Sequence, residues 1–414
     1  MNRNDDYKRL ADSYFDFLAE RFPVMCASDE FDFLPRAENA SKYYDKLDHF
    51  KSNAVEDVID ELKSFQKRFA AADAEDVDLE RFIDLKLLQA NAAGILIELD
   101  IKRAWRYNPL LYLKIGFIGL DHALNKPAED TREVRGRALS RLSAIPDLLK
   151  NGMENIQSVP ETYYQASLMM AGDCKQYLNQ LGNELSPIFV DHHDAAIGTL
   201  ENAAGALEDF SRFLKSKSPG PDKQFAVSTL EASLTDHFLV SHSPEEILLI
   251  AREEWQEILG QLVHLQSRID PDKTWEQLYH AFTPSQIAET EIIALYKDEI
   301  DRLRNFFGKN GFSEELLNSP LEIRYTPVYL RSVRSSASFA AAFSRDSREK
   351  SYFYISTYFP RHQSKETDHY LQRRLNREYK MLTAHETIPG HHFLDSCRRM
   401  HKNPIRRQIE SPLF

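Results

Sequence analysis

The chain has 414 residues, of which 42% are hydrophobic and 28% are charged, as in an ordinary soluble globular protein. Its formal net charge of -12 argues against a nucleic-acid partner, because phosphate binding requires clustered Lys and Arg side chains. With only 14 glycines, the chain is also poor in the residue that glycine-rich nucleotide-binding loops need.

We expect neither a secretory signal nor a membrane partner. The first residues, MNRNDDYKRL, contain no apolar core and no small-residue cleavage site. No run of about 18 apolar residues occurs, so no helix is expected to span a membrane. The three cysteines, Cys26, Cys174 and Cys397, are far apart in the sequence, which favours reduced thiols over a disulfide framework. The sequence therefore predicts a cytoplasmic protein.

Most of the chain is predicted to be helical. In residues 54–71, AVEDVIDELKSFQKRFAA, the apolar residues recur every three or four positions, which places them in one stripe of a helix. Helix starts are predicted at Ser158, Ser243 and Thr283, where a hydroxyl precedes a proline and a Glu or Gln follows. Gly311 suits the end of a helix. The predicted fold class is therefore mainly α.

One proline-rich segment and two strand-like segments interrupt this pattern. Residues 215–224, KSKSPGPDKQ, form a predicted loop. The loop either separates an N-terminal helical region, 1–214, from a C-terminal region, 225–414, or lies on the surface of one continuous domain. The segments 321–330 and 351–359 are rich in β-branched and aromatic residues, which predicts a small sheet within about residues 320–360.

The stretch HETIPGHHF, residues 385–393, is the main candidate for a functional site. In a regular helix, the metal-binding partner of His385 would stand at position 389, which is a proline. His391 would point about 240° away from His385, and His392 would lie about 10.5 Å further along the axis. A regular helix therefore brings neither histidine to a metal that His385 binds.

Pro389 and Gly390 change this geometry. The proline ring collides with the carbonyl of His385, four residues earlier, and the glycine adds backbone freedom. The pair thus predicts a bulge or kink that carries His391 to the place of the usual second ligand. From spacing alone, a metal site and a group of surface or core histidines at a helix end remain equally open.

Other histidines serve as comparisons. The run DHHD, residues 191–194, offers four possible ligands, but adjacent side chains on a helix point about 100° apart, which favours a solvated face. His362 and His369 lie in a polar segment before the motif. We interpret them as surface residues that could approach the site.

The motif resembles that of domain-of-unknown-function family 885, whose members carry H-E-x-x-P-G-H-H, and this chain matches every fixed position. Weaker similarities to the family occur in residues 22–34, FPVMCASDEFDFL, and in residues 103–113 and 141–149. The family resembles helix-rich zinc metallopeptidases of the Taq carboxypeptidase and neurolysin type. This resemblance implies a mostly helical fold with a small β-sheet lining a cleft.

The resemblance also implies a role for each residue of the motif. His385 and His391 would be zinc ligands and Glu386 the general base, while His392 is an alternative to His391 or a supporting neighbour. The implied cofactor is zinc and the implied substrate is a peptide or small amide. An oxyanion-stabilising group would come from a set of candidates that the sequence does not rank: Tyr354, Tyr358, Tyr370 and His369.

The chain departs from the family pattern after the histidines. The family places a third ligand, a glutamate in an E-G-W-A-x-Y motif, a few tens of residues later, and the closing RRQIESPLF lacks that motif. We interpret the chain as a truncated form, with Glu410 as the remaining candidate for third ligand and zinc bound weakly or not at all. Asp395 is expected to support a ligand or to lie at the surface.

Two functions follow from these observations. The first is a zinc-dependent peptidase or amide hydrolase that uses metal-activated water. The second is a catalytically inactive helical protein that binds a peptide or protein partner in its cleft. The sequence determines neither the substrate nor the oligomeric state.

Overall fold

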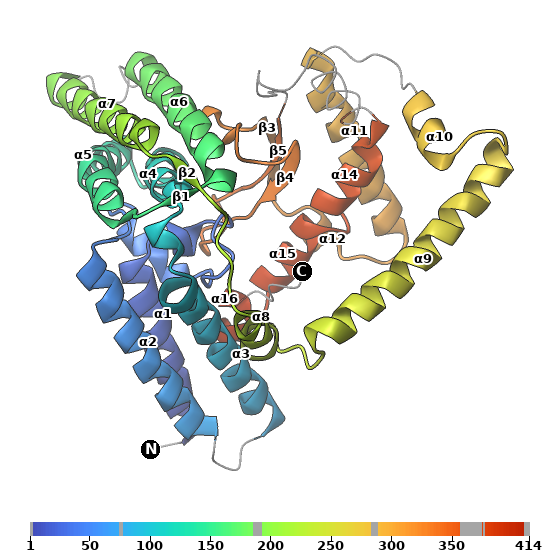
Figure 1. Ribbon diagram of the computed structural model, residues 1–414, viewed down its shortest axis with the longest axis horizontal. Coiled ribbons are helices and arrows are strands. Elements are labelled where there is room, and N and C mark those ends of the chain that lie inside the picture. Colours follow the sequence, from blue (N-terminus) through green and yellow to red (C-terminus); the bar gives the residue numbers. More distant parts are fainter. Residues whose placement is uncertain are drawn as a thin grey trace.

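The computed structural model describes residues 3–73, 78–184, 193–282, 289–356, 375 and 377–409 (Figure 1). Helices dominate the chain, and the strands form only small sheets, so the predicted mainly α fold is confirmed. Among the described helices, none combines the length and apolar composition needed to cross a bilayer.

Seven long helices make up the N-terminal half: α1 (Arg3–Arg21), α2 (Ser52–Asp73), α3 (Leu79–Leu96), α4 (Pro109–Asn125), α5 (Thr131–Asn155), α6 (Glu161–Glu184) and α7 (His193–Ser216). The apolar stripe predicted for residues 54–71 lies on α2, and its members are buried. Side chains cap the N-termini of several helices; for example, the side chain of Asp78 accepts a hydrogen bond from the amide of Arg81 at the start of α3. The N-terminal half is therefore held together by the buried apolar faces of its helices, as the spacing of apolar residues in the sequence indicates.

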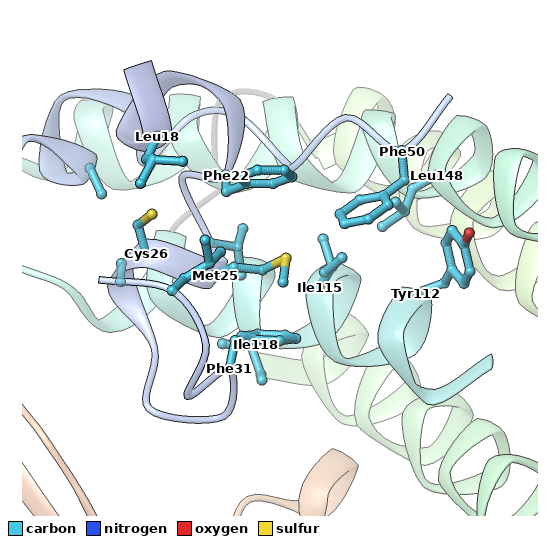
Figure 2. Close-up of a cluster of buried hydrophobic side chains, with 14 of the residues drawn as sticks. Leu18, Phe22, Met25, Cys26, Phe31, Phe50, Tyr112, Ile115, Ile118 and Leu148 are labelled. Atoms are coloured by element: carbon cyan, nitrogen blue, oxygen red, sulfur yellow. The ribbon is translucent and has the colours of Figure 1, made fainter. Parts of the chain in front are cut away.

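The interior of this half is continuous and apolar. Figure 2 shows Phe22, Met25 and Phe31 packed against Ile115 and Ile118 of α4. The same cluster includes Tyr329, Leu330, Ile405 and Ile409, which come from the far end of the chain. Residues on both sides of the 215–224 loop therefore share one core, and the proposed division at this loop remains a prediction.

The middle of the chain is more open. It contains β1 (Val159–Pro160), β2 (Pro219–Gly220), α8 (Val227–Ala232), α9 (Pro244–Ile269), α10 (Trp275–Ala281), α11 (Glu289–Lys309) and α12 (Glu314–Leu317). The capping box predicted at Ser243 opens α9, where Ser243 and Glu246 bond each other's backbone. Gly311 follows α11 with φ 88°, in agreement with the predicted helix end. The helix start predicted at Thr283 lies outside the described residues.

Short 3-10 or π turns connect these elements: Met25–Ala27, Glu38–Tyr43, Ile97–Lys102, Ala104–Arg106, Ser233–His237 and Val328–Leu330.

A three-stranded sheet lies beside the motif helices. Its strands are β3 (Leu321–Tyr325), β4 (Ala337–Ala340) and β5 (Ser351–Ile355), in the order β3-β5-β4. β3 runs parallel to β5, and β4 runs antiparallel to it with Phe339 opposite Phe353. The two predicted strand segments thus contain β3 and β5, whereas β4 was not predicted.

The two faces of this sheet meet different parts of the protein. Phe353 and Ile355 pack with Tyr296 of α11 in a separate apolar cluster. The alternate residues, Tyr352 and Tyr354, stack on each other on the opposite face. The sheet therefore lies between the N-terminal helices on one side and α11 and α14 (Tyr379–Glu386) on the other (Figure 1).

The motif forms α14 (Tyr379–Glu386) and α15 (His391–Arg399), and α16 (Pro404–Gln408) then returns to the N-terminal half. Arg406 bonds the buried Asp84 of α3, and Arg407 pairs with Glu38. The amide of Arg36 also donates to the carbonyl of Gln408. These contacts hold the motif helices against the N-terminal half.

Asp48 is a buried acid in this N-terminal half. Its carboxylate accepts from the amides of Val24 (2.7 Å) and Met25 (3.2 Å). Burial nevertheless raises its pKa from 3.8 to about 7, against the opposing effects of those amides and of Arg141. Because the folded protein binds this proton more tightly than the unfolded chain does, the carboxyl stabilises the fold most at low pH.

We therefore predict that Asp48 lowers the free energy of unfolding by up to about 4 kcal/mol as the pH rises from about 4 to 7. Urea unfolding across this window should show a pH-dependent difference between wild type and Asp48→Asn. Asp45→Asn, at an exposed position three residues away, should show no such difference. A difference for Asp48→Asn that stays constant with pH would contradict the assignment.

Candidate functional site

The motif helix breaks between Glu386 and His391. Thr387 leaves the helical region, with φ -121° and ψ -88°, and the Ile388–Pro389 peptide bond is cis. The turn is closed by hydrogen bonds from the Gly390 amide to the Ala384 carbonyl (3.0 Å) and from the Phe393 amide to the Thr387 carbonyl (3.0 Å). The distortion predicted at Pro389 and Gly390 is therefore present, as a break between two helices rather than a bulge within one.

Position 390 lies against the backbone of the preceding helix. A Cβ atom there would lie 1.8 Å from the carbonyl oxygen of His385 and 2.6 Å from that of Ala384. Both obstacles are main-chain atoms and cannot rotate away, so this turn requires glycine.

The break brings two histidines together. The ring centroids of His385 and His391 are 4.8 Å apart, and the rings are nearly perpendicular, at 83°. His391 also stacks on Phe339 of β4, with 6.4 Å between centroids and 12° between planes. His385 is exposed and His391 is half-buried. The approach of His391 to His385 that the Pro-Gly pair predicts is confirmed, and whether the two bind a metal remains a prediction.

Glu386 lies between these histidines and the sheet. Its side chain is buried, and its Oε2 accepts a hydrogen bond of 2.8 Å from the amide of Phe339. Burial raises the pKa of the carboxyl, while His391, the Phe339 amide and His385 oppose that rise. The carboxylate is thus desolvated by burial and lies within electrostatic range of both imidazoles.

His392 points elsewhere. It is 1% exposed, its ring is 5.8 Å from that of Phe339, and burial lowers its pKa to about 4. Neither ring nitrogen makes a hydrogen bond of good geometry within the described residues, although the backbone of Ser319 lies near enough to raise the pKa. The structure places His391, and not His392, in ring contact with His385.

Asp395 does not lie at the surface. It is 3% exposed and pairs with Arg36 and with Arg398, at 2.6 Å from the latter. Of the two alternatives for Asp395, the surface position is wrong, and the support of a metal ligand remains a prediction. The carboxylate joins α15 to the N-terminal half.

The remaining sequence candidates are scattered or outside the description. Tyr354 is buried on the sheet face opposite Phe353, and its pKa is raised by burial. Other candidates lie outside the described residues: Tyr358, Tyr370, His362, His369, Glu410 and the first half of the 191–194 run. His193 begins α7, whose first side chains are likewise undescribed.

The donor set suits a metal only in part. Imidazole nitrogens are good zinc ligands, and a catalytic zinc ion takes three protein ligands and a water. Within the described parts of the chain, no group of three His, Cys, Asp or Glu side chains could hold a metal ion. The described residues thus bring two imidazoles together, His385 and His391, which is one donor short of such a set.

The family described as "Bacterial protein of unknown function (DUF885)" matches residues 36–410. The chain belongs to this family. The match covers the DUF885 protein from before α2 to the end of α16, including the whole motif.

Comparison with solved structures shows the fold. A "putative lipoprotein of unknown function from Shewanella oneidensis" aligns with a TM-score of 0.60 and 14% identity, over 88% of this chain and 68% of that one. A comparison with curated proteins finds no significant match. At this identity the similarity supports a common fold and no activity.

Sequence reasoning missed two features of the site. β4, ASFA, consists mostly of small residues that do not signal a strand, yet Phe339 contacts Glu386 and His391. Arg334 was also missed, although its Nη2 donates to the carbonyl of Phe339 (2.6 Å). The strand predicted for residues 351–359 was the nearest signal for β4, because a strand is stable only beside neighbouring strands.

Gly390→Ala should destabilise this DUF885 protein by about 3 kcal/mol or more, because the added methyl group cannot fit beside the His385 carbonyl. Urea unfolding measures the change. Gly136→Ala in α5, where a Cβ meets nothing within 4 Å, is the matched control and should stabilise by roughly 0.5–1 kcal/mol. Equal effects of the two substitutions would show that the turn tolerates a side chain.

Proposed function

We propose that this DUF885 protein is a zinc-dependent hydrolase of peptide or related small amide bonds. The observation that carries the proposal is the contact between the rings of His385 and His391, with the Glu386 carboxylate near enough for both histidines to lower its pKa. The family relationship adds no activity, since DUF885 is described as a family of unknown function.

In this proposal, His385 and His391 hold the zinc ion together with a third ligand that we leave unassigned. Bound zinc would supply a water with a pKa near neutrality and would polarise the scissile carbonyl. Two tasks remain for residues of the chain: one side chain must accept the proton of the water, and others must orient that side chain.

Glu386 is suited to accept that proton. The Phe339 amide anchors its Oε2, and no hydrogen bond to its Oε1 is found within the described residues. One oxygen is therefore fixed by β4 while the other can receive a proton from water. Burial, which raises the carboxyl pKa, makes Glu386 a stronger base than an exposed glutamate.

The cytoplasm is part of the same proposal. Cys26, Cys174 and Cys397 are unpaired thiols in the structure, and Cys26 and Cys174 are buried. Unpaired cysteines suit a reducing compartment.

Glu386→Gln should abolish hydrolysis of a peptide library, with at least about a hundredfold loss of rate, because the amide cannot take the proton from water. Zinc affinity, measured by competition with a chromophoric chelator, should stay within about threefold of wild type, since Glu386 is not a ligand. Wild-type activity should also fall as the pH drops below the raised pKa of Glu386, where the base becomes protonated.

Glu314→Gln, at an exposed position in α12, is the control and should leave the rate unchanged. Hydrolysis that survives in Glu386→Gln would end the proposal that Glu386 is the base of a hydrolase at this site. Peptide binding by a wild-type protein that hydrolyses nothing would favour an inactive binding protein instead.

A further inference from the structure

A small polar cavity lies on the other face of the sheet from the motif. Its volume is about 50 Å³, and its walls come from residues 27–30, from α4, and from the ends of β4 and β5. A cavity of this size holds roughly three or four water-sized groups. We call it the α4–sheet cavity.

The cavity is connected to the candidate site along the outer edge of β4. The Phe339 amide donates to Glu386, and two residues further on the Ala341 amide donates to Asp29 (3.3 Å). Arg334 lines the cavity and lowers the pKa of Glu386 through its charge. At about 3.3 Å per residue, the two amides are about 7 Å apart along the strand.

The carboxylates around the cavity differ in how they are paired. Its lining contains four carboxylates, Asp29, Glu30, Asp121 and Glu349. Arg334 lies 3.6 Å from Asp29 and 3.1 Å from Glu30. Lys114 pairs with Glu30, and Lys126 pairs with Glu349. Lys350, also in the lining, pairs with Glu322.

Asp121 is paired differently from the other three lining carboxylates. Within the described residues no cation lies within ion-pair distance of it, and its partners are the neutral Asn125 (3.0 Å) and the hydroxyl of Tyr329. It is half-buried, and desolvation raises its pKa to about 6, although Lys126 and Arg324 act through their charges to lower it.

His122 has a ring nitrogen without a hydrogen-bond partner at the same cavity. It lines the same cavity and is 9% exposed, and its Nδ1 has no hydrogen-bond partner among the described residues. Burial and the nearby Lys126 and Arg141 lower its pKa well below the usual value, so the ring is neutral. A neutral imidazole can accept a hydrogen bond, and a buried polar atom without a partner is costly.

We propose that the α4–sheet cavity binds the alkylammonium group of the substrate, with Asp121 as its counter-ion and His122 as a neutral acceptor. The binding step follows from the cavity itself, and only its assignment to a substrate rests on the proposed hydrolase function. The ammonium could come from a lysine side chain or from a free α-amino terminus.

The binding step is tested with n-butylammonium chloride on the full chain, by titration of the thermal unfolding midpoint. Butylammonium should raise the midpoint, whereas n-butanol and sodium butyrate should not, a comparison that needs no variant. In Asp121→Asn the dissociation constant should rise about tenfold or more. Asp147→Asn, at an exposed position in α5, should match wild type. An equal response to butanol, or an unchanged response in Asp121→Asn, would refute the cavity assignment.

Two peptide pairs then identify the source of the ammonium. N-acetylated peptides with lysine or norleucine at one position test the side chain, and lysine-free peptides with a free or acetylated terminus test the α-amino group. If butylammonium binding depends on Asp121 but no peptide is hydrolysed, the ammonium site is supported and the proposed hydrolase function is refuted. Hydrolysis of all four peptides at equal rates would support the hydrolase and overturn the assignment of the cavity to the substrate.

Discussion

The close approach of Gly390 to the carbonyl of His385 is the constraint on which the site depends. The chain can double back within four residues only because position 390 has no Cβ, and this reversal sets the ring of His391 beside that of His385. If α14 continued as a regular helix, the two rings would point to different sides. The same turn buries His392 and Asp395, so α15 is fastened to the rest of the protein while His385 stays exposed.

β4 connects this turn with the N-terminal half. It is an edge strand, and side chains satisfy its outer backbone groups: Glu386 and Arg334 bond Phe339, and Asp29 bonds Ala341. Glu386, Arg334 and Asp29 therefore all bond the backbone at or next to this short strand. This arrangement places the α4–sheet cavity within reach of a molecule bound near Glu386.

Local rules predicted much of this structure. The stripe on α2, the cap at Ser243, the strands β3 and β5, and the meeting of His385 with His391 all follow from spacing and backbone chemistry. Contacts across the chain could not be predicted. Asp29 and Ala341 are 312 positions apart, and no local pattern joins them. The raised pKa of Glu386 likewise results from burial against β4, a strand of small residues with no signal of its own. The third ligand of the proposed zinc site likewise cannot be predicted from a local sequence pattern.

The pairing of His385 with His391 is the central claim, and zinc affinity tests it most directly. The dissociation constant should be measured by chelator competition for wild type, His385→Ala, His391→Ala, the double variant and His392→Ala. We predict that each of the first two substitutions weakens binding at least about tenfold, because a single imidazole holds zinc poorly. The double variant should bind little worse than either single variant, and His392→Ala should resemble wild type. Zinc binding that depends on His392 and not on His391 would contradict the account.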